Sequence, residues 1–259
     1  MFIQRFFTER PGKYWDEMEE IYGSTFDMRI FGLPSIFTKD PNFVKHMLTG
    51  DSFTNFEKGE WFNGMFADFL GNGIFNSDRE MWKDLARRSR HHRIYARDTT
   101  ASTLSSAIYM LARNPGILKR LREQIVAGVG REETPTYESA RSLVYLRAFI
   151  NEVLRMYPAV PFNVRASINE DVFVAETGKP LYIPPRVRIS YGIFNLQRRP
   201  DLWGTDASTF DPDRWLDERI SLYKKNPFIW TPFSAGPRLC LGQQFGANLP
   251  RNLRYQPTD

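Results

Sequence analysis

The stretch "PFSAGPRLCLGQQFG", residues 232–246, contains Cys240, the only cysteine among 259 residues. A lone cysteine cannot form an internal disulfide, so its thiol is a small buried hydrophobe, a nucleophile or a metal ligand. The residues after Cys240 are typical of a helix start, where the helix dipole favours the thiolate. Glycines at 236 and 242 let a flat ligand approach the backbone, and Arg238 can pair with an anionic group. These features suit a thiolate bound to haem iron, and a cysteine nucleophile fits the same residues.

Composition sets the broad class of the protein. Apolar residues make up 42% and charged residues 25%, as in ordinary soluble globular proteins. The net charge of +5 indicates a basic surface or a docking patch for an acidic partner. The sequence contains no basic-aromatic recognition motif, so nucleic acid is not an expected partner. No apolar run reaches the 18 or so residues that a membrane span needs, so we expect no anchor in this chain.

Hydrophobic periodicity predicts a mainly α protein with a small antiparallel β-sheet. The predicted helices cover residues 11–23, 40–50, 78–88, 98–113, 114–130 and 137–158. Two hairpins are predicted, over residues 25–40 and 171–183, and a further strand over 187–191. Residues 195–232 are rich in Pro, Asp and Trp and have little periodicity, which predicts an ordered but irregular segment.

The stretch around Cys240 resembles the haem-binding signature of the cytochrome P-450 family, F-x-x-G-x-R-x-C-x-G. The matching residues are Phe233, Gly236, Arg238, Cys240 and Gly242. The resemblance implies the cytochrome P-450 fold, with haem b as cofactor and Cys240 as the iron ligand. It also implies monooxygenation, in which one oxygen atom from O₂ enters a lipophilic organic substrate. Electrons would come from NADPH through NADPH-cytochrome reductase or a similar partner, at the endoplasmic reticulum membrane.

A second segment, "NEVLRMYP", has Glu152 and Arg155 in the family's E-x-x-R spacing. Both residues lie off the apolar face of their predicted helix, so periodicity alone predicts a solvated ion pair. The resemblance implies instead that the pair is buried against an arginine from the later "FDPDRW" segment. Arg214 occupies that position, so we expect Glu152, Arg155 and Arg214 to form a structural triad.

Further motifs resemble residues that serve the cofactor. Arg165 resembles a family arginine that pairs with a haem propionate, and Trp82 a tryptophan that contacts a propionate. The arginine that the family has four residues after that tryptophan is replaced by Ala86. Asp98 and Thr99 resemble the acid–alcohol pair that guides protons to iron-bound dioxygen, although Asp followed by Thr is also typical of a helix N-cap.

The sequence departs from the family between two of these motifs. Asp98 follows Trp82 by only sixteen positions, where the family has a series of helices that includes the lid over the substrate. We therefore expect an internally truncated fold. Residues 1–93 would form its N-terminal helix and hairpin part, and residues 94–259 the remainder, within one structural domain.

Two alternatives to a monooxygenase follow from the same residues. The first is a truncated haem-binding remnant that is non-catalytic or misfolded, because loss of the lid would leave the chain unable to turn over substrate. The second is a cysteine hydrolase, which needs a histidine base near Cys240, and the candidates are His46, His91 and His92. Without an anchor, the chain alone would be cytoplasmic.

Overall fold

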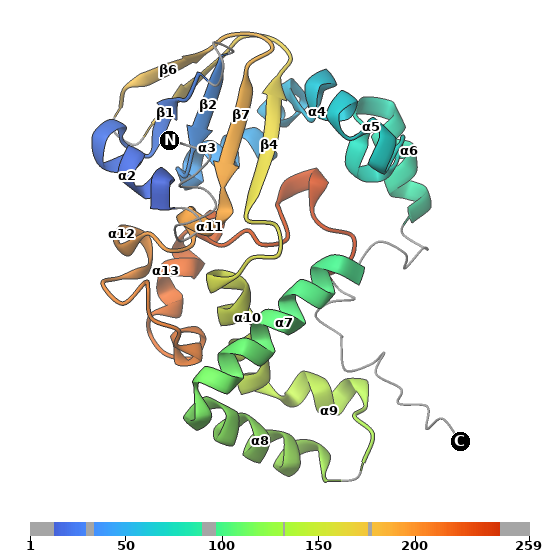
Figure 1. The fold of residues 1–259 in the computed structure, drawn as a ribbon, viewed down its shortest axis with the longest axis vertical. Helices are drawn as coiled ribbons and strands as arrows, with labels where there is room; N and C mark the ends of the chain where they lie inside the picture. The colour runs from blue at the N-terminus through green and yellow to red at the C-terminus, as the bar shows by residue number, and fades with distance from the viewer. Residues whose placement is uncertain (1–12, 30–33, 90–96, 132, 176–177, 244–259) are drawn as a thin grey trace.

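The computed structural model describes residues 13–29, 34–89, 97–131, 133–175 and 178–243. Figure 1 shows a β-sheet with its covering helices at one end of the molecule and the helices α7 to α10 at the other. The segment that leads to Cys240 crosses the middle of this view, in red. The cysteine is therefore carried between two regions that are built from distant parts of the chain.

The larger sheet has five strands in the order β1, β2, β7, β4 and β3. Their bounds are Thr25–Asp27, Ser35–Thr38, Arg188–Gly192, Phe162–Ser167 and Phe56–Glu57. A separate two-stranded sheet consists of β5 (Asp171–Val174) and β6 (Pro180–Ile183). Both predicted hairpins are confirmed, because β1 pairs antiparallel with β2 and β5 pairs antiparallel with β6.

The prediction of an antiparallel sheet is wrong in one respect. Strands β2 and β7 run parallel, with Ile36 opposite Ile189, so the sheet is mixed. Parallel neighbours need a long connection between them, and here it includes the helices from α3 to α10. Periodicity identifies a strand but not its distant partner, so this pairing could not be inferred from the sequence.

The mainly helical character is confirmed. The helices are α2 (Lys13–Tyr22), α3 (Pro41–Leu48), α4 (Gly59–Met65), α5 (Ala67–Leu70), α6 (Arg79–Ser89), α7 (Arg97–Arg113), α8 (Pro115–Val129), α9 (Tyr137–Ser142), α10 (Val144–Met156), α11 (Ile193–Leu196), α12 (Pro200–Trp203) and α13 (Ile220–Lys225). Single 3₁₀ turns are η1 (Asp51–Asn55), η2 (Ile74–Asn76), η3 (Pro212–Trp215), η4 (Pro227–Ile229) and η5 (Gly236–Arg238). The irregular segment predicted after residue 195 is thus a series of short turns.

The helix predicted over residues 137–158 is interrupted at Leu143, which separates α9 from α10. A side chain from another helix explains the interruption. Gln124 of α8 accepts hydrogen bonds through its Oε1 from the backbone N–H groups of Tyr145 and Leu146, at 3.0 and 3.3 Å. These groups belong to the first turn of α10, where the helix has no internal acceptors for them. The break therefore depends on a tertiary contact that local periodicity does not report.

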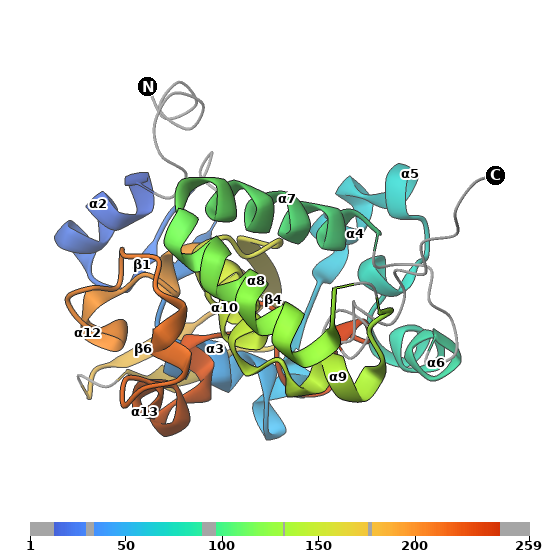
Figure 2. The ribbon, with the colours of Figure 1, turned by 90° about the horizontal axis from the view of Figure 1, so that it is seen from below.

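Each end of the molecule has its own hydrophobic core, and a third cluster surrounds Trp203 and Trp215. The first joins β2, β7 and α3 around side chains such as Ile36, Phe43 and Ile189. The second joins α7, α8 and α10, which lie together in Figure 2, around side chains such as Met110 and Phe149. Among the described residues, no helix is both long and apolar enough to cross a membrane.

Candidate functional site

Residues 233–243, here called the cysteine loop, form a tight turn that presents Cys240 at the surface. The backbone N–H of Cys240 donates to the carbonyl of Phe233 at 2.9 Å, which closes the loop. Ser234 and Gly236 both have a φ of 63° in the left-handed region, so the backbone reverses direction sharply. The Cys240 side chain is exposed and its thiol is free. The buried-hydrophobe interpretation of this cysteine is therefore wrong for the chain as described.

Gly236 sets the position of the cysteine loop against the rest of the fold. A Cβ atom at this position would lie 1.9 Å from the carbonyl oxygen of Leu48, at the end of α3. Only glycine allows this approach, and its positive φ also favours glycine. The loop therefore rests directly on the α3 backbone.

The other signature residues have different surroundings. Phe233 packs edge-on against Trp230, with ring centroids 6.3 Å apart. Gly242 lies in the turn that follows Cys240. The helix that the sequence predicts after this turn falls mainly on residues 244–259, outside the described residues.

Arg238 and Trp82, which were predicted separately, are in contact. The Arg238 guanidinium lies 4.1 Å from the centroid of the Trp82 ring, a cation–π arrangement. It also donates to the carbonyl of Ser77 at 3.0 Å and to Oδ1 of Asp78 at 2.7 Å. The cysteine loop is thus tied to the N-terminal turn of α6.

Arg165 is a buried cation with neutral partners. Its side chain belongs to β4 and is only 2% exposed. Its Nη1 donates to the carbonyl of Val164 at 2.8 Å and to Oδ1 of Asn163 at 3.4 Å. Among the described residues, no carboxylate lies within salt-bridge distance of it. Burying an unpaired charge is costly, so this environment favours an anionic partner.

Lys58, which sequence reasoning missed, completes a group of three cations. Its Nζ donates to the same Oδ1 of Asn163 at 2.7 Å. Burial, followed by the charges of Arg165 and Arg238, holds the pKa of Lys58 well below its ordinary value. We call Lys58, Arg165 and Arg238 the cation cluster. No local signal marks Lys58, because its role depends on contacts with residues more than 100 positions away.

One carboxylate, Asp78, faces the cation cluster. It accepts backbone N–H bonds from Lys58 and Gly59 at 2.9 and 3.0 Å, besides the bond from Arg238. Burial opposes the ionisation of Asp78, but these hydrogen bonds outweigh it and lower its pKa. Burial and the charge of Arg165 lower the pKa of Arg238 to about 10. Among the described residues, Asp78 is the one carboxylate within 4.0 Å of these three cations, so the cluster carries more positive charge than Asp78 neutralises.

Asp98 and Thr99 lie in the first turn of α7, and both are exposed. In Figures 1 and 2 this end of α7 is the one nearer to the cysteine loop. Within the described parts of the chain, no hydrogen bond or ion pair joins these two residues to the loop. Their assignment to proton transfer therefore stays a prediction.

The ionic triad of Glu152, Arg155 and Arg214 is confirmed, and the solvated ion pair that periodicity predicted is wrong. These side chains are between 0 and 1% exposed. Arg155 binds Glu152 through two bonds of 2.8 Å, and Nε of Arg214 lies 3.6 Å from Oε1 of Glu152. The segment before the cysteine loop covers the triad, and the indole N–H of Trp215 donates to Glu152 at 3.0 Å. The triad therefore anchors the segment that leads to Cys240.

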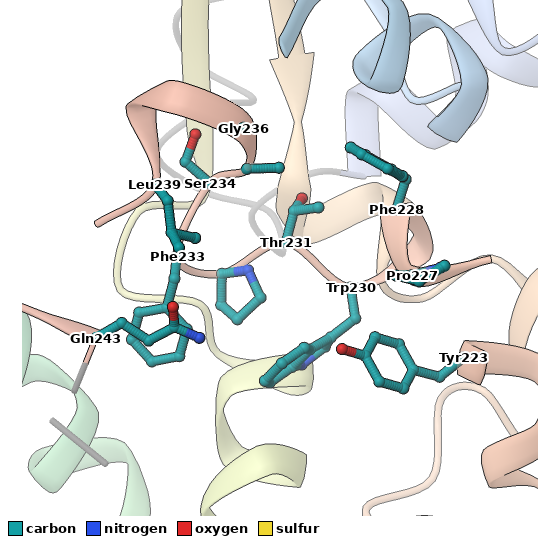
Figure 3. A pocket seen from close by; sticks show the side chains of 12 residues that line it. Tyr223, Pro227, Phe228, Trp230, Thr231, Phe233, Ser234, Gly236, Leu239 and Gln243 are labelled. Atoms are coloured by element: carbon teal, nitrogen blue, oxygen red, sulfur yellow. The ribbon is translucent and has the colours of Figure 1, made fainter. Parts of the chain in front are cut away.

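A pocket of about 210 Å³ is lined in part by the cysteine loop and is shown in Figure 3. Its walls include the rings of Tyr223, Trp230 and Phe233. Neither Cys240 nor any member of the cation cluster lines it. The end of the irregular segment and the cysteine loop form this pocket together, apart from the cations.

A histidine base for Cys240 is not found among the described residues. His46 of α3 lies 2.8 Å from Oδ2 of Asp171, and it packs near Phe56 and Phe173. His91 and His92 lie outside the described residues. Within the part of the chain that the structure describes, the hydrolase alternative therefore has no histidine base beside Cys240.

Comparison with known proteins gives a consistent result. A family model described as Cytochrome P450 matches residues 1–92 and 94–248. The chain is 40% identical over 155 residues to Cytochrome P450 52-E3 of Starmerella bombicola, covering 58% of this chain and 30% of that protein. It is 42% identical over 160 residues to Cytochrome P450 monooxygenase pvhE of Talaromyces variabilis, covering 58% and 28%. With Cytochrome P450 52A6 of Candida tropicalis the identity is 40% over 161 residues, covering 59% and 30%. The chain spans less than a third of the length of these relatives.

Proposed function

Because the chain belongs to the cytochrome P450 family, we propose that it carries the haem-thiolate site of a monooxygenase. The reaction would place one oxygen atom from O₂ into a lipophilic organic substrate. The observation that carries the proposal is the position of an exposed cysteine loop beside a cation cluster with surplus positive charge. A haem b group has an iron that needs an axial ligand and two carboxylates that need cations, so the residues fit the group.

The roles of the residues follow from their chemistry. The Cys240 thiolate would bind the iron, and Gly236 would hold the loop in the conformation that presents it. Arg165 and Arg238 would bind the propionates, with Trp82 supporting Arg238 through its ring face. Iron held by a thiolate supplies the activation of dioxygen when the group is bound. Buried arginines suit the carboxylates because they stay charged and donate in a fixed planar geometry.

Proton delivery is the role proposed for Asp98 and Thr99. The Asp98 carboxyl would exchange protons with solvent, and the Thr99 hydroxyl would pass a proton inward. Asp98 lies in the first turn of α7. Its exposure gives it the access to bulk water that such a role requires.

Electrons would come from NADPH through a reductase. A basic protein with a net charge of +5 suits an acidic partner surface, since opposite charges steer association. Attachment to the endoplasmic reticulum membrane is part of the same proposal by family resemblance.

The short connection between α6 and α7 affects how efficiently the chain would convert substrate. Helix α6 ends at Ser89 and α7 begins at Arg97, so we propose that the family's intervening helices are absent from this chain. The substrate side of the haem would then be more open to water, and reducing equivalents would be lost as peroxide. The ratio of hydroxylated product to NADPH consumed measures this. A ratio near one would show that the missing helices are dispensable.

The proposed function is tested by measuring whether Cys240 binds the haem iron. The chain is reconstituted with haem, reduced and exposed to carbon monoxide, and its Soret band is recorded. We expect the long-wavelength band of a thiolate complex, which the C240S and C240H variants lose. Because Cys240 is exposed, both variants are expected to fold as the original chain does. The same spectrum from all three chains would rule out thiolate ligation.

A further inference from the structure

A series of aromatic rings leads away from the cysteine loop. Phe233, whose carbonyl accepts the Cys240 N–H, packs edge-on against Trp230 with ring centroids 6.3 Å apart. Trp230 packs edge-on in turn against Tyr223 at 5.6 Å and against Trp215 at 5.1 Å. Figure 3 shows the Tyr223 hydroxyl pointing toward the Trp230 ring. Indole and phenol are the most easily oxidised aromatic side chains, so electrons can pass along this series.

The charges beside these rings select a direction for electron transfer. Trp215 leads inward to Trp203 at 5.6 Å, and the Arg155 guanidinium lies 5.2 Å from the centroid of the Trp203 ring. A ring that loses an electron becomes positive, and a nearby cation opposes this by Coulomb repulsion. Among the described residues, no cation–π contact is made to Trp230 or Tyr223. Electrons are therefore supplied most readily through Tyr223, which lies half-buried on α13.

The surroundings of Trp230 make its oxidation reversible. Its indole nitrogen is buried and has no hydrogen-bond partner among the described residues. No base is therefore placed to take the N–H proton when the ring is oxidised. The ring keeps this proton and returns to its original form by taking one electron from Tyr223. The Tyr223 phenol loses its proton on oxidation, and its partial exposure lets that proton reach solvent.

We propose that Trp230 and Tyr223 carry electrons from the surface to an oxidant at Cys240, and that this oxidant is peroxide. Reduction of one peroxide to two waters takes up two electrons and two protons. Each electron leaves a Tyr223 phenol and passes through Trp230, while the phenol proton enters solvent, from which the peroxide takes its protons. A thiol or ascorbate in solution then returns one electron and one proton to each tyrosyl radical. This inference rests on the proposed function and adds a protective redox activity to it.

The first experiment generates the oxidant at Cys240 without haem. Cys240 is the only cysteine and is exposed, so a thiol-reactive ruthenium complex labels this position alone. A laser flash, with an electron acceptor in solution, turns the label into a one-electron oxidant. A nitroso spin trap captures the radical that results, and peptide mass spectrometry locates the adduct. We expect the adduct at Tyr223, and we expect Y223F to show an indole radical in its place.

Two substitutions of Trp230 separate electron transfer from packing. W230F and W230Y both replace the indole by a smaller ring, but only tyrosine can be oxidised. We expect W230F to lose the Tyr223 adduct and W230Y to retain it. Circular dichroism establishes that both variants are folded to the same extent.

Trp203 provides the matched control within the same group of rings. W203F also removes an indole, but at the inner end beside Arg155. It should leave the Tyr223 adduct unchanged. If W230F forms this adduct as the original chain does, or if W203F removes it as fully as W230F, the inference is wrong.

The second experiment repeats the trapping with the haem-loaded chain and hydrogen peroxide. The Tyr223 adduct should form again and should be lost in W230F. Its absence from the haem-loaded original chain would overturn the inference and leave the proposed function intact. If the chain binds no haem, the proposed function fails and the peroxide reaction fails with it, whatever the labelled chain shows.

Discussion

The ionic triad and the cation cluster are built from the same residue types but differ in their charge balance. In the triad, Arg155 has two bonds to Glu152 and further bonds to the carbonyls of Gln197, Ala207 and Thr209. Its guanidinium is fully satisfied without any outside group. In the cation cluster, Arg165 is 2% exposed, and its hydrogen-bond acceptors among the described residues are neutral.

The difference separates a structural role from a binding role. A buried charge persists only where something compensates it. The triad contains its compensation, and its members hold α10 and η3 together. The described residues around the cation cluster lack such compensation, which agrees with the anion that we propose binds there. Burial of arginine alone does not distinguish the two roles, whereas the count of neighbouring carboxylates does.

The largest expected effect is the loss of the triad's carboxylate. E152A leaves Arg155 and Arg214 buried without their carboxylate, which typically costs about 3–5 kcal/mol. This is a large part of the stability of an ordinary domain, so soluble expression should fall sharply. Soluble yield and denaturant midpoint measure the effect. E218A removes the same charge from an exposed position and serves as control. Unchanged unfolding of E152A would show that the triad contributes little.

Removing an arginine should affect stability differently in the two clusters. R165M removes an uncompensated cation, so the haem-free chain should be unchanged or about 1 kcal/mol more stable. Its haem affinity should fall at least tenfold. R155M should instead lose about 3–5 kcal/mol, because Glu152 is left buried. Thermal unfolding of the haem-free variants checks this contrast. A loss of stability in R165M as large as that in R155M would mean that both clusters are structural.

A smaller effect concerns the edge of the triad. Hydrogen bonds from Arg214 lower the pKa of Asp206 from 3.8 to about 2. Burial opposes this shift, and hydrogen bonds from Arg219 add to it. The depressed pKa stabilises the fold above about pH 4, and this contribution is lost as the pH falls from 4 to 2. Because the side chain is 37% exposed, solvent screening limits the contribution to about 1 kcal/mol.

The D206N variant tests this linkage. Its free energy of unfolding should be lower than that of the original chain at pH 6, and the two should converge near pH 2. Acid titration of both proteins, followed by circular dichroism, measures the difference. Parallel curves over this range would mean that Asp206 is not coupled to folding.

Features that depend on neighbours in the sequence were predictable. Asp40 accepts from the N–H groups of Asn42 and Phe43, and Pro41 occupies the first turn, as the cap pattern of α3 predicts. The signature around Cys240 is also local, and Gly236 occupies a position where the loop geometry requires glycine.

Features that depend on distant contacts were not predictable. Periodicity placed Glu152 on a solvated face, because it does not register that η3 covers this side of α10. No sequence pattern marked Lys58, because Asn163 and Arg165 come near it only in the folded chain. Asp78 is the first residue of a predicted helix, and its carboxylate accepts hydrogen bonds from the backbone N–H groups of Lys58 and Gly59, which the sequence does not indicate. The family resemblance suggested roles for Glu152 and Arg165 that periodicity did not indicate. No feature of the sequence suggested a role for Lys58.

The contact between Gly236 and Leu48 has a consequence for the order of assembly. The cysteine loop packs against α3 and the turn before α6, which precede Cys240 by more than 150 residues. On a ribosome these segments emerge long before the loop does, because domains are synthesised from the N-terminus. Cys240, the proposed iron ligand, is therefore synthesised after the segments on which its loop packs. Cofactor capture would then follow completion of the chain rather than direct its folding.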